Sequence, residues 1–234
     1  MSDGRPPLTV LMPVYNEVRT LEQAVQSVLE ADALPERELI VVDDGSTDGS
    51  TELLRSHDWP DNVRVLYHDR NQGKGAAVRT AVKEARGEVS AIFDADLEYE
   101  PDDIAALLEP IVGGSFNACF GARVFEGHTS HSFLYVMGNR GVTLAANLLF
   151  NVYIKDIMTC HKAIRTEIFK ELPLRARGFE IEPEITARLL QRGERIYEVP
   201  ANYSARTHPE GKKLTSIDGL RVLATLLRCR LTPR

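Results

Sequence analysis

The sequence predicts an α/β fold built on an open, mostly parallel sheet with helices on both faces. Short apolar runs rich in β-branched residues alternate with amphipathic stretches through the first half of the chain, which is typical of βαβ units. Polar, acidic and glycine-rich residues follow each of the first four apolar runs, where open sheets of this kind bind ligands. A chain of 234 residues with 43% hydrophobic content is long enough to bury one such core.

The expected elements follow one another in a regular order. Strands are predicted at residues 8–14, 38–42, 63–67, 89–93 and 118–121. Between them, right-handed crossovers are predicted to contain helices at 18–30, 51–56, 76–86 and 104–108. The second half is predicted to hold a helix at 133–153, a strand at 161–164, a helix at 183–192, a strand at 195–199 and a helix at 214–229. We expect residues 1–213 to form one α/β domain and residues 214–234 a basic amphipathic helix and tail.

Composition and charge restrict the location of the protein and its partners. The longest stretch without Asp, Glu, Lys or Arg runs from Gly141 to Ile154, which is shorter than the roughly 20 apolar residues that span a bilayer. The first residues lack the basic and apolar regions of a secretion signal, so we expect a cytoplasmic protein. Cys119, Cys160 and Cys229 form neither a disulfide framework nor a zinc pattern. The net charge is −6, and no nucleic acid is expected among the partners.

The strongest local signal is a pair of carboxylates directly after the predicted strand at 89–93. Asp94 and Asp96, with Ala95 between them, leave a buried strand together, which is costly unless a cation neutralises them. Mg²⁺ and Mn²⁺ take oxygen ligands and share them with substrate phosphates. Glu98 is close enough in sequence to reach the same ion. The motif therefore predicts a divalent metal site, and the alternative is an acidic turn that caps the following helix.

Two further loops at predicted strand ends carry groups suited to a nucleotide. Asp43 and Asp44 end the second strand, where carboxylates accept hydrogen bonds from a ribose or a base. Residues 71–75 open a helix, and their bare N–H groups beside Lys74 suit a phosphate or the polar edge of a base. The spacing is not that of a Walker loop, so kinase or ATPase chemistry is not expected.

Six short motifs occur in one order along residues 8–215. They are Pro13-Val14-Tyr15-Asn16-Glu17, Val42-Asp43-Asp44-Gly45-Ser46-Thr47-Asp48, Asn71-Gln72-Gly73-Lys74-Gly75, Asp94-Ala95-Asp96-Leu97, Gly121-Ala122-Arg123, and Arg206 with Gly211-Lys212-Lys213. Together they resemble the inverting family 2 glycosyltransferases of GT-A fold, and within them the dolichol-phosphate mannose synthase-like, polyprenyl-phosphate sugar synthases. The resemblance implies transfer of a hexose from a nucleotide sugar, of the GDP-mannose or UDP-glucose type, to dolichyl or undecaprenyl phosphate, with Mg²⁺ or Mn²⁺ as cofactor.

The resemblance also implies roles for individual residues. It assigns nucleotide binding to Pro13, Tyr15, Asn16, Glu17, Asp44, Lys74, Asp94 and Ala95. It assigns the metal to Asp94, Asp96 and Glu98, although the family usually has Gln at the last of these positions. It assigns the acceptor phosphate to a clamp of Arg123, Arg140, Arg206 and Lys212. The catalytic residues that it implies are Asp96, Arg123 and Arg206.

The acceptor decides which residues such a reaction needs. A lipid phosphate is already an anion and attacks without a general base, whereas a sugar hydroxyl needs a carboxylate to take its proton. Arginines then matter more than a base, since they offer fixed planar donors to phosphate. Glu182 and Glu184 lie where hydroxyl-directed relatives place their base, so a soluble hydroxyl acceptor is the first alternative. Pro183 at a first helical position with Glu184 behind it equally suits a plain helix start.

Two other classes of protein are weaker alternatives. A non-catalytic nucleotide-sugar-binding subunit would not need the metal that Asp94-Ala95-Asp96 suits. A nucleotidyl transferase would ordinarily carry a glycine-rich, basic loop after the first strand, where this chain has Tyr15-Asn16-Glu17.

The C-terminal part of the chain is basic, with seven Lys or Arg against two acids from Ala201 onward. The predicted helix there places its apolar side chains on one stripe, namely Leu214, Ile217, Leu220, Ala224 and Leu227. Such a helix lies at a membrane surface or packs on the core. The expected partners therefore include the inner face of the membrane through peripheral contact, or a membrane partner protein.

Overall fold

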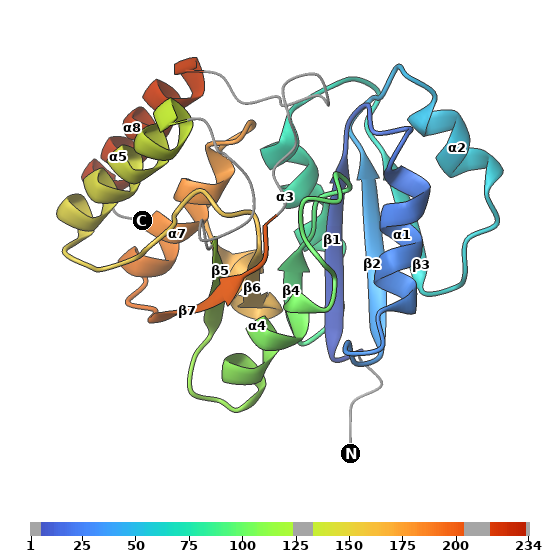
Figure 1. The fold of residues 1–234 in the computed structure, drawn as a ribbon, viewed down its shortest axis with the longest axis horizontal. Coiled ribbons are helices and arrows are strands. Elements are labelled where there is room, and N and C mark those ends of the chain that lie inside the picture. Colours follow the sequence, from blue (N-terminus) through green and yellow to red (C-terminus); the bar gives the residue numbers. More distant parts are fainter. Residues whose placement is uncertain (1–5, 124–132, 204–215, 233–234) are drawn as a thin grey trace.

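The structure is a computed structural model that describes residues 6–123, 133–203 and 216–232. Its centre is a seven-stranded sheet in the order β3-β2-β1-β4-β6-β5-β7 (Figure 1). The strands are β1 (Leu8–Val14), β2 (Arg37–Asp43), β3 (Val63–Tyr67), β4 (Val89–Ile92), β5 (Ala118–Arg123), β6 (Lys162–Arg165) and β7 (Ile196–Ala201). The helices are α1 (Leu21–Glu30), α2 (Ser50–Ser56), α3 (Lys74–Glu84), α4 (Asp103–Val112), α5 (Phe133–Phe150), α6 (Thr166–Glu171), α7 (Ile181–Gln191) and α8 (Ser216–Leu231).

The direction of the strands brings the motif-bearing loops together. Strands β1 to β4 pair in parallel, and β7 pairs in parallel with β5. Strand β6 runs antiparallel to both of its neighbours, β4 and β5. The carboxyl ends of β1, β2, β3, β4 and β5 therefore share one edge of the sheet, where α/β proteins bind their ligands. The predicted open, mostly parallel sheet is confirmed.

Alternate side chains of each strand enter two hydrophobic cores on opposite faces of the sheet, as expected for strands covered on both sides. On β1, Val10 and Met12 enter the first core and Leu11 the second, and all three are fully buried. Each such side chain contributes about 1.5–3 kcal/mol to folding. Helices α1, α2 and α4 cover the first core, and α3, α6 and α7 cover the second.

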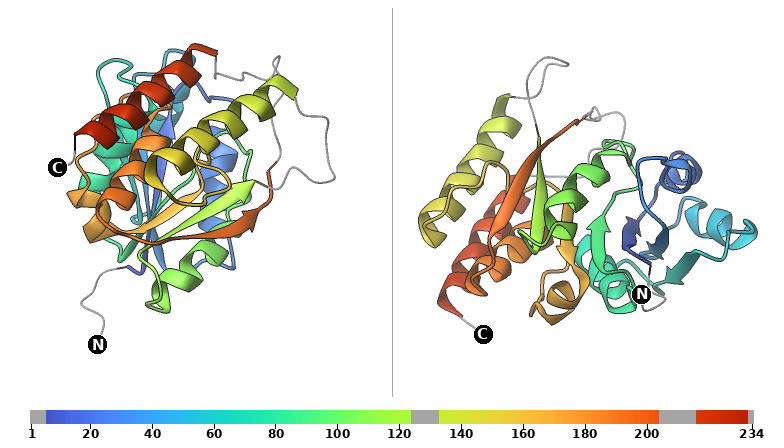
Figure 2. Two further views of the ribbon diagram at one scale, coloured as in Figure 1. Left: turned by 90° about the vertical axis from the view of Figure 1, so that its left-hand side faces the viewer. Right: turned by 90° about the horizontal axis from the view of Figure 1, so that it is seen from below.

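Helices α5 and α8 form a further layer outside α7. They lie side by side (Figure 2), and both contact α7. Ala146 of α5, Ala187 of α7 and Leu226 of α8 belong to a third core that holds this layer together. Among the described residues, no helix is both long and apolar enough to cross a membrane.

Most element boundaries differ from the sequence prediction by a few residues, and three differences have clear causes. Helix α5 ends at Phe150 rather than near residue 153, because Asn151 takes a left-handed conformation with φ of 51°. Helix α7 begins at Ile181, so Pro183 is its third residue and not its first. A first-turn proline is tolerated there because its missing N–H has no acceptor within the helix. The short helix α6 was not predicted, since it is only six residues long and too short to show a clear periodicity.

Candidate active site

The loops after β1 and β2 are joined by hydrogen bonds between backbone amides and side chains. Asn16 has φ of 55°, a left-handed conformation that asparagine tolerates. Its Oδ1 accepts the N–H of Thr47 at 2.8 Å, and its own N–H donates to Ser46 Oγ at 3.0 Å. The N–H of Glu17 donates to Ser50 Oγ at 3.0 Å. This network fixes Asn16 and Glu17, two of the half-buried residues predicted to hold the nucleoside, and Pro13 and Tyr15 precede them in the same segment.

Asp44 organises the loop before α3. Its side chain is 2% exposed, and its oxygens accept the N–H groups of Gln72 at 2.9 Å and Gly73 at 2.7 Å. His68 Nδ1 lies 2.6 Å from the same carboxylate, and the other ring nitrogen lies 2.9 Å from Thr80 Oγ1. Asp44 therefore fixes the backbone of the predicted nucleotide loop through its hydrogen bonds to Gln72 and Gly73. Its contact with the nucleoside stays a prediction.

The start of α3 packs directly against the backbone before α7. Gly73 has φ of 97°, and a Cβ there would lie 2.3 Å from the carbonyl oxygen of Arg177. A Cβ on Gly75 would lie 2.6 Å from the carbonyl oxygen of Ala176. The N–H of Gly75 donates to the Arg177 carbonyl at 2.7 Å. Only glycine fits at both positions of the Asn71-Gln72-Gly73-Lys74-Gly75 motif.

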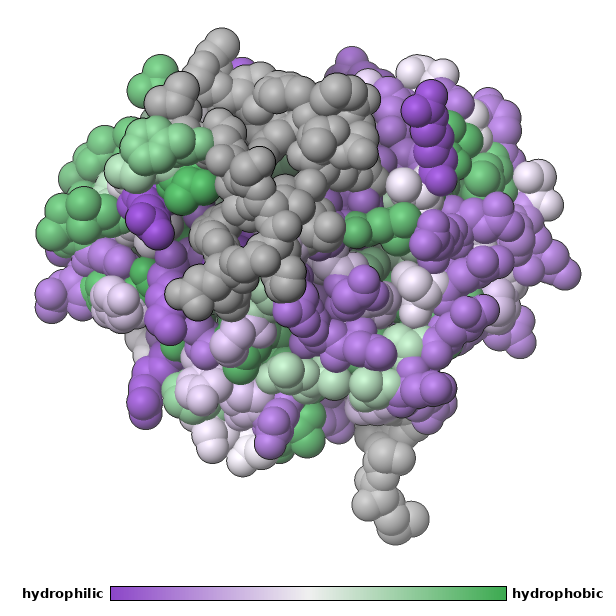
Figure 3. Space-filling view, in the orientation of Figure 1, coloured by the Kyte–Doolittle hydropathy of each residue, from purple (hydrophilic) through white to green (hydrophobic). Residues whose placement is uncertain are grey.

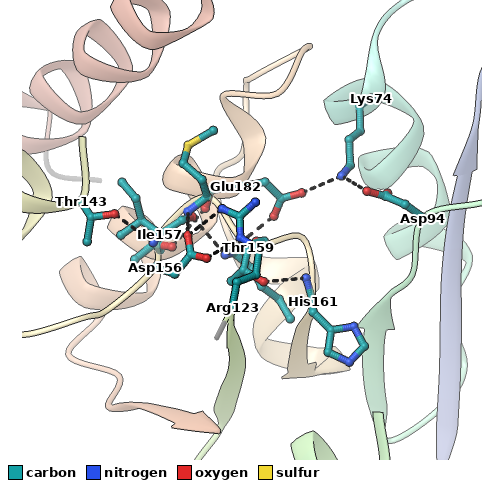
Figure 4. Close-up of polar contacts among 12 residues, drawn as sticks. Lys74, Asp94, Arg123, Thr143, Asp156, Ile157, Thr159, His161 and Glu182 are labelled. Carbon is teal, nitrogen blue, oxygen red and sulfur yellow. Dashed lines mark hydrogen bonds and ion pairs between the residues drawn. The ribbon is translucent and has the colours of Figure 1, made fainter. Parts of the chain in front are cut away.

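Lys74, the first residue of α3, points across the strand ends to β4 (Figure 4). Its Nζ donates to Asp94 Oδ2 at 2.7 Å and lies 3.1 Å from Glu182 Oε1. Burial by itself lowers the pKa of Lys74, but the carboxylates of Asp94 and Glu182 outweigh it and hold the pKa well above its usual value. Lys74 is therefore a cation between two acids from different elements.

Asp96 is crowded by other acids at the end of β4. Burial, and then the charges of Asp94 and Glu98, raise the pKa of Asp96 to about 7. Ala95 is 2% exposed and packs into the first core, so it offers only its backbone to a ligand. Glu98 Oε2 accepts a hydrogen bond from Tyr203 at 2.8 Å.

The oxygen-rich chemistry of these acids fits a divalent cation that also binds phosphate. Within residues 6–123, 133–203 and 216–232, however, no three His, Cys, Asp or Glu side chains are grouped as a complete metal site. Asp94 pairs with Lys74 and Glu98 with Tyr203, so substrate oxygens would have to supply part of the coordination. Asp94, Asp96 and Glu98 as ligands stay a prediction.

Glu182 and Lys162 form a buried charged pair behind Lys74. The Glu182 side chain is 3% exposed, and its Oε2 lies 3.8 Å from Lys162 Nζ. Lys162 is fully buried, donates to the carbonyl oxygens of Ile157 at 3.2 Å and Thr159 at 2.6 Å, and lies 4.1 Å above the centre of the Phe120 ring. Burial lowers the pKa of Lys162 to about 8.

Glu184 has a structural role. Its Oε2 accepts the N–H groups of Arg175 at 2.8 Å and Ala176 at 2.6 Å, and its Oε1 accepts a hydrogen bond from Arg228 of α8 at 3.1 Å. Its side chain is fully buried. Glu184 thus holds the segment before α7 and the helix α8 in place. Of the two candidate bases, only Glu182 lies beside Lys74 and Lys162.

Arg123, at the end of β5, is held by a carboxylate in this structure. Its Nε and Nη2 donate to Asp156 at 2.6 Å and 2.9 Å, and Asn139 Nδ2 donates to the same carboxylate at 3.1 Å. Burial alone would raise the pKa of Asp156, but the Arg123 guanidinium outweighs it and lowers the pKa. The guanidinium also lies 5.1 Å from the centre of the Tyr203 ring.

Of the other members of the predicted acceptor clamp, the structure describes Arg140. Arg140 lies on α5 with an exposed side chain, one residue after Asn139. Arg206 and Lys212 lie outside the described residues. The acceptor clamp stays a prediction.

Sequence reasoning missed several residues that build this site. His68, Asp156 and Lys162 each position a predicted residue, yet none belongs to a motif. Their partners are distant in sequence, so periodicity gives no signal for them. The one available hint for Lys162 was its place at the start of a short predicted strand, since an unpaired lysine is rarely buried.

Comparison with known proteins defines the class. The model of glycosyl transferase family 2 matches residues 9–173. The chain belongs to this family, and it is a glycosyltransferase with a GT-A-like fold.

Individual relatives and a solved structure are similar to most of this chain. A dolichol-phosphate mannosyltransferase from Pyrococcus furiosus is 29% identical over 88% of this chain, and the match spans only 58% of that relative's length. A polyprenol monophosphomannose synthase from Mycolicibacterium smegmatis is 29% identical over 84% of this chain and 77% of its own. Among solved structures, glucosyl-3-phosphoglycerate synthase from Mycobacterium tuberculosis, in complex with Mn²⁺, UDP and glucosyl-3-phosphoglycerate, has a TM-score of 0.73. It is 21% identical, with 99% of this chain and 82% of that chain covered, and this likeness concerns the fold.

Proposed function

We propose that the protein transfers a hexose, with inversion, from a nucleotide sugar to a polyprenyl phosphate. The observation that carries the proposal is the meeting of Asp94, Asp96 and Lys74 at the carboxyl end of β4 in a family 2 chain. Relatives whose names specify dolichyl and polyprenyl phosphate mannosyl transfer support this acceptor.

A divalent cation, Mg²⁺ or Mn²⁺, is part of the proposal. Asp94 and Asp96 would hold it, with Glu98 as a third candidate. When bound, the metal neutralises the charge of the departing diphosphate. The raised pKa of Asp96 supports this role, because three neighbouring acids favour a cation between them. The structural neighbour solved with Mn²⁺ and UDP supports it by analogy.

The remaining site residues would bind and orient the substrates. Tyr15, Asn16, Glu17 and the loop organised by Asp44 would line the nucleoside. Lys74 would lie beside the diphosphate. Arg123, with Arg140, Arg206 and Lys212, would bind the acceptor phosphate, which attacks without a general base. The alternative, a hydroxyl acceptor, would need Glu182 as its base, and the two lysines beside that carboxylate do not favour this.

Peripheral contact with a membrane surface would bring the enzyme to its lipid acceptor. Helix α5 contains no acidic residue and exposes apolar side chains, as does the neighbouring α8. The apolar face consists of Phe133, Met137, Leu144, Leu148, Leu220, Leu227 and Leu231. In Figure 3 hydrophobic residues gather on the side of the molecule where these two helices lie. Basic side chains such as Arg140 and Arg230 accompany them, which favours an anionic bilayer.

The test is transfer of radiolabelled sugar from GDP- and UDP-sugars into organic-extractable polyprenyl phosphate, with Mn²⁺ or Mg²⁺. We expect label in the lipid with the wild-type chain and at least about a hundredfold less with Asp96→Ala. Asp61→Ala, which removes an exposed acid far from the site, serves as the matched control. Label that appears only in a water-soluble product would replace the lipid acceptor with a hydroxyl acceptor, and Glu182→Gln would then abolish transfer.

A further inference from the structure

Lys74 is shared unequally between two acids. Its Nζ makes a hydrogen bond of 2.7 Å to Asp94, the predicted metal ligand, whereas its contact of 3.1 Å with Glu182 is an ion pair without hydrogen-bond geometry. Both acids are within reach of the same ammonium group without any backbone movement. A lysine can move its hydrogen bonds from one such acid to the other, because its ammonium group is a compact charge on a flexible stem with three donors.

Glu182 is a buried carboxylate whose hydrogen-bonding capacity is unused. Among the described residues neither of its oxygens has a hydrogen-bond partner, although the side chain is 3% exposed. Leaving a buried charged group without hydrogen bonds is costly, so such a group calls for an explanation. Lys162 does not supply the missing bonds, since its ammonium donates to the carbonyl oxygens of Ile157 and Thr159 and is 3.8 Å away.

A divalent cation at Asp94 would compete with the ammonium group of Lys74. Both are cations that need the same carboxylate, and Asp94 Oδ2 is already taken by the lysine. A metal that binds there repels the lysine, which then needs another anion within reach. Glu182 is that anion, 3.1 Å away and with free acceptor capacity.

We propose that Lys74 occupies the metal's place beside Asp94 in the metal-free protein and shifts to Glu182 when the metal binds. Glu182 is then a positioning residue: it receives the displaced ammonium and holds it next to the diphosphate. Lys162 fixes the far side of Glu182 and stays where it is. The inference rests on the metal site of the proposed function, and it extends that site by an exchange between two carboxylates.

The test measures binding of Mn²⁺ alone, from the electron paramagnetic resonance signal of the free ion. Lys74→Met should bind Mn²⁺ about tenfold more tightly than the wild type, because the competing cation is gone. Glu182→Gln should bind it about tenfold more weakly, because the displaced lysine has no second anion, and Glu182→Asp should recover part of the loss. Lys83→Met is the matched control, since it removes one charge from the exposed end of the same helix.

The outcomes separate this inference from the proposed function. Equal Mn²⁺ affinity in wild type, Lys74→Met and Glu182→Gln would overturn the exchange, while a site that is lost in Asp96→Ala would still support the metal. If neither the wild type nor Lys74→Met binds Mn²⁺, the metal site itself is wrong. Lys74→Arg keeps the charge and should bind Mn²⁺ as weakly as the wild type, which guards against a folding defect in the Met variant.

Discussion

The two halves of the active-site edge are built in different ways. After β1, β2 and β3, side chains such as Asn16 and Asp44 receive their hydrogen bonds mainly from backbone amides. After β4 and β5, charged side chains pair with each other, as in Arg123 with Asp156 and Lys74 with Asp94. The loops after β1, β2 and β3, the predicted nucleotide side, are therefore fixed mainly by the main chain. The loops after β4 and β5, where Arg123 is predicted to bind the acceptor and which we call the acceptor side, depend on ion pairs that one substitution can break. The pair of Lys74 and Asp94 joins the two sides.

The largest effect is expected on the acceptor side, at the buried pair of Arg123 and Asp156. Arg123→Met should lower the free energy of unfolding by about 3–5 kcal/mol, because it leaves Asp156 charged and buried. The double variant with Asp156→Leu should regain much of that loss, since no uncompensated charge remains. Urea unfolding of the two single variants and the double variant measures both quantities.

A surface pair provides the control for this experiment. Arg192 and Glu171 are 2.6 Å apart, with side chains 29% and 60% exposed, and Glu171→Ala should cost less than about 1 kcal/mol. If Arg123→Met were as mild as Glu171→Ala, the acceptor side would not depend on its buried ion pair.

A second large effect is expected from pH at His161, which also lies on the acceptor side. His161 is 1% exposed and stacks on Tyr99 with ring centres 4.9 Å apart, and burial lowers its pKa from 6.5 to about 4. The unfolded chain therefore takes up this proton at a higher pH than the folded chain. The contribution of the neutral ring to the free energy of unfolding is fully present above about pH 6.5. It is lost progressively as pH falls from there through about 4, by about 3 kcal/mol in total.

The pH effect is measured as a difference between two proteins. His161→Phe keeps the ring stack but removes the titrating group, so its unfolding free energy should fall less steeply between pH 6.5 and pH 4 than that of the wild type. Parallel pH profiles for the two proteins would show that His161 is not responsible. His57→Phe, a substitution at an exposed histidine, should leave the profile unchanged.

On the nucleotide side, Asp44→Ala should cost less than the Arg123 substitution, about 2–3 kcal/mol. The amides of Gln72 and Gly73 lose their acceptor, but they lie in a loop that water can reach. Thermal unfolding measures the cost, with Asp69→Ala as the control for an exposed acid in the neighbouring loop. A loss greater than that of Arg123→Met would reverse the comparison between the two sides.

The smallest effect on stability is expected at the apolar face of α5 and α8. Leu144 and Leu148 are 59% and 76% exposed, so the pair of changes Leu144→Gln and Leu148→Gln should alter stability by less than about 0.5 kcal/mol. Co-sedimentation with vesicles of anionic lipid should nevertheless fall at least about fivefold. Val112→Gln, at an exposed apolar position on α4, should not affect it. Unchanged co-sedimentation of the double variant would exclude this face as the membrane contact.

The sequence predicted the first half of the fold more accurately than the second. Strands β1 and β3 were predicted to the residue, because each is a short run rich in apolar and β-branched residues bounded by polar turns. The reversal of β6 could not be predicted, since a four-residue strand carries no signal of direction. The packing of α8 against α7 was equally hidden, because it uses Val222, Leu226 and Cys229, whereas three members of the predicted stripe, Leu220, Ala224 and Leu227, are exposed.

The site could be predicted where it consists of loops at strand ends. Asp94, Asp96 and Lys74 were found because their motifs follow apolar runs, and the structure brings Asp94 and Lys74 into contact. Glu182 and Glu184 were indistinguishable in sequence, since both lie in the first turn of one helix. Helix geometry turns them in different directions, one toward Lys74 and the other toward the amides of Arg175 and Ala176.

The backbone contact between the start of α3 and the segment before α7 limits which substitutions and loop grafts this chain can accept. With Gly73 and Gly75 set against the carbonyl groups of Arg177 and Ala176, there is no room for a side chain at either glycine. The two segments are about a hundred positions apart in the chain, and a change in the backbone path of either would therefore disturb the other. An engineer who grafts the nucleotide loop of a relative onto this chain must graft residues 175–178 with it.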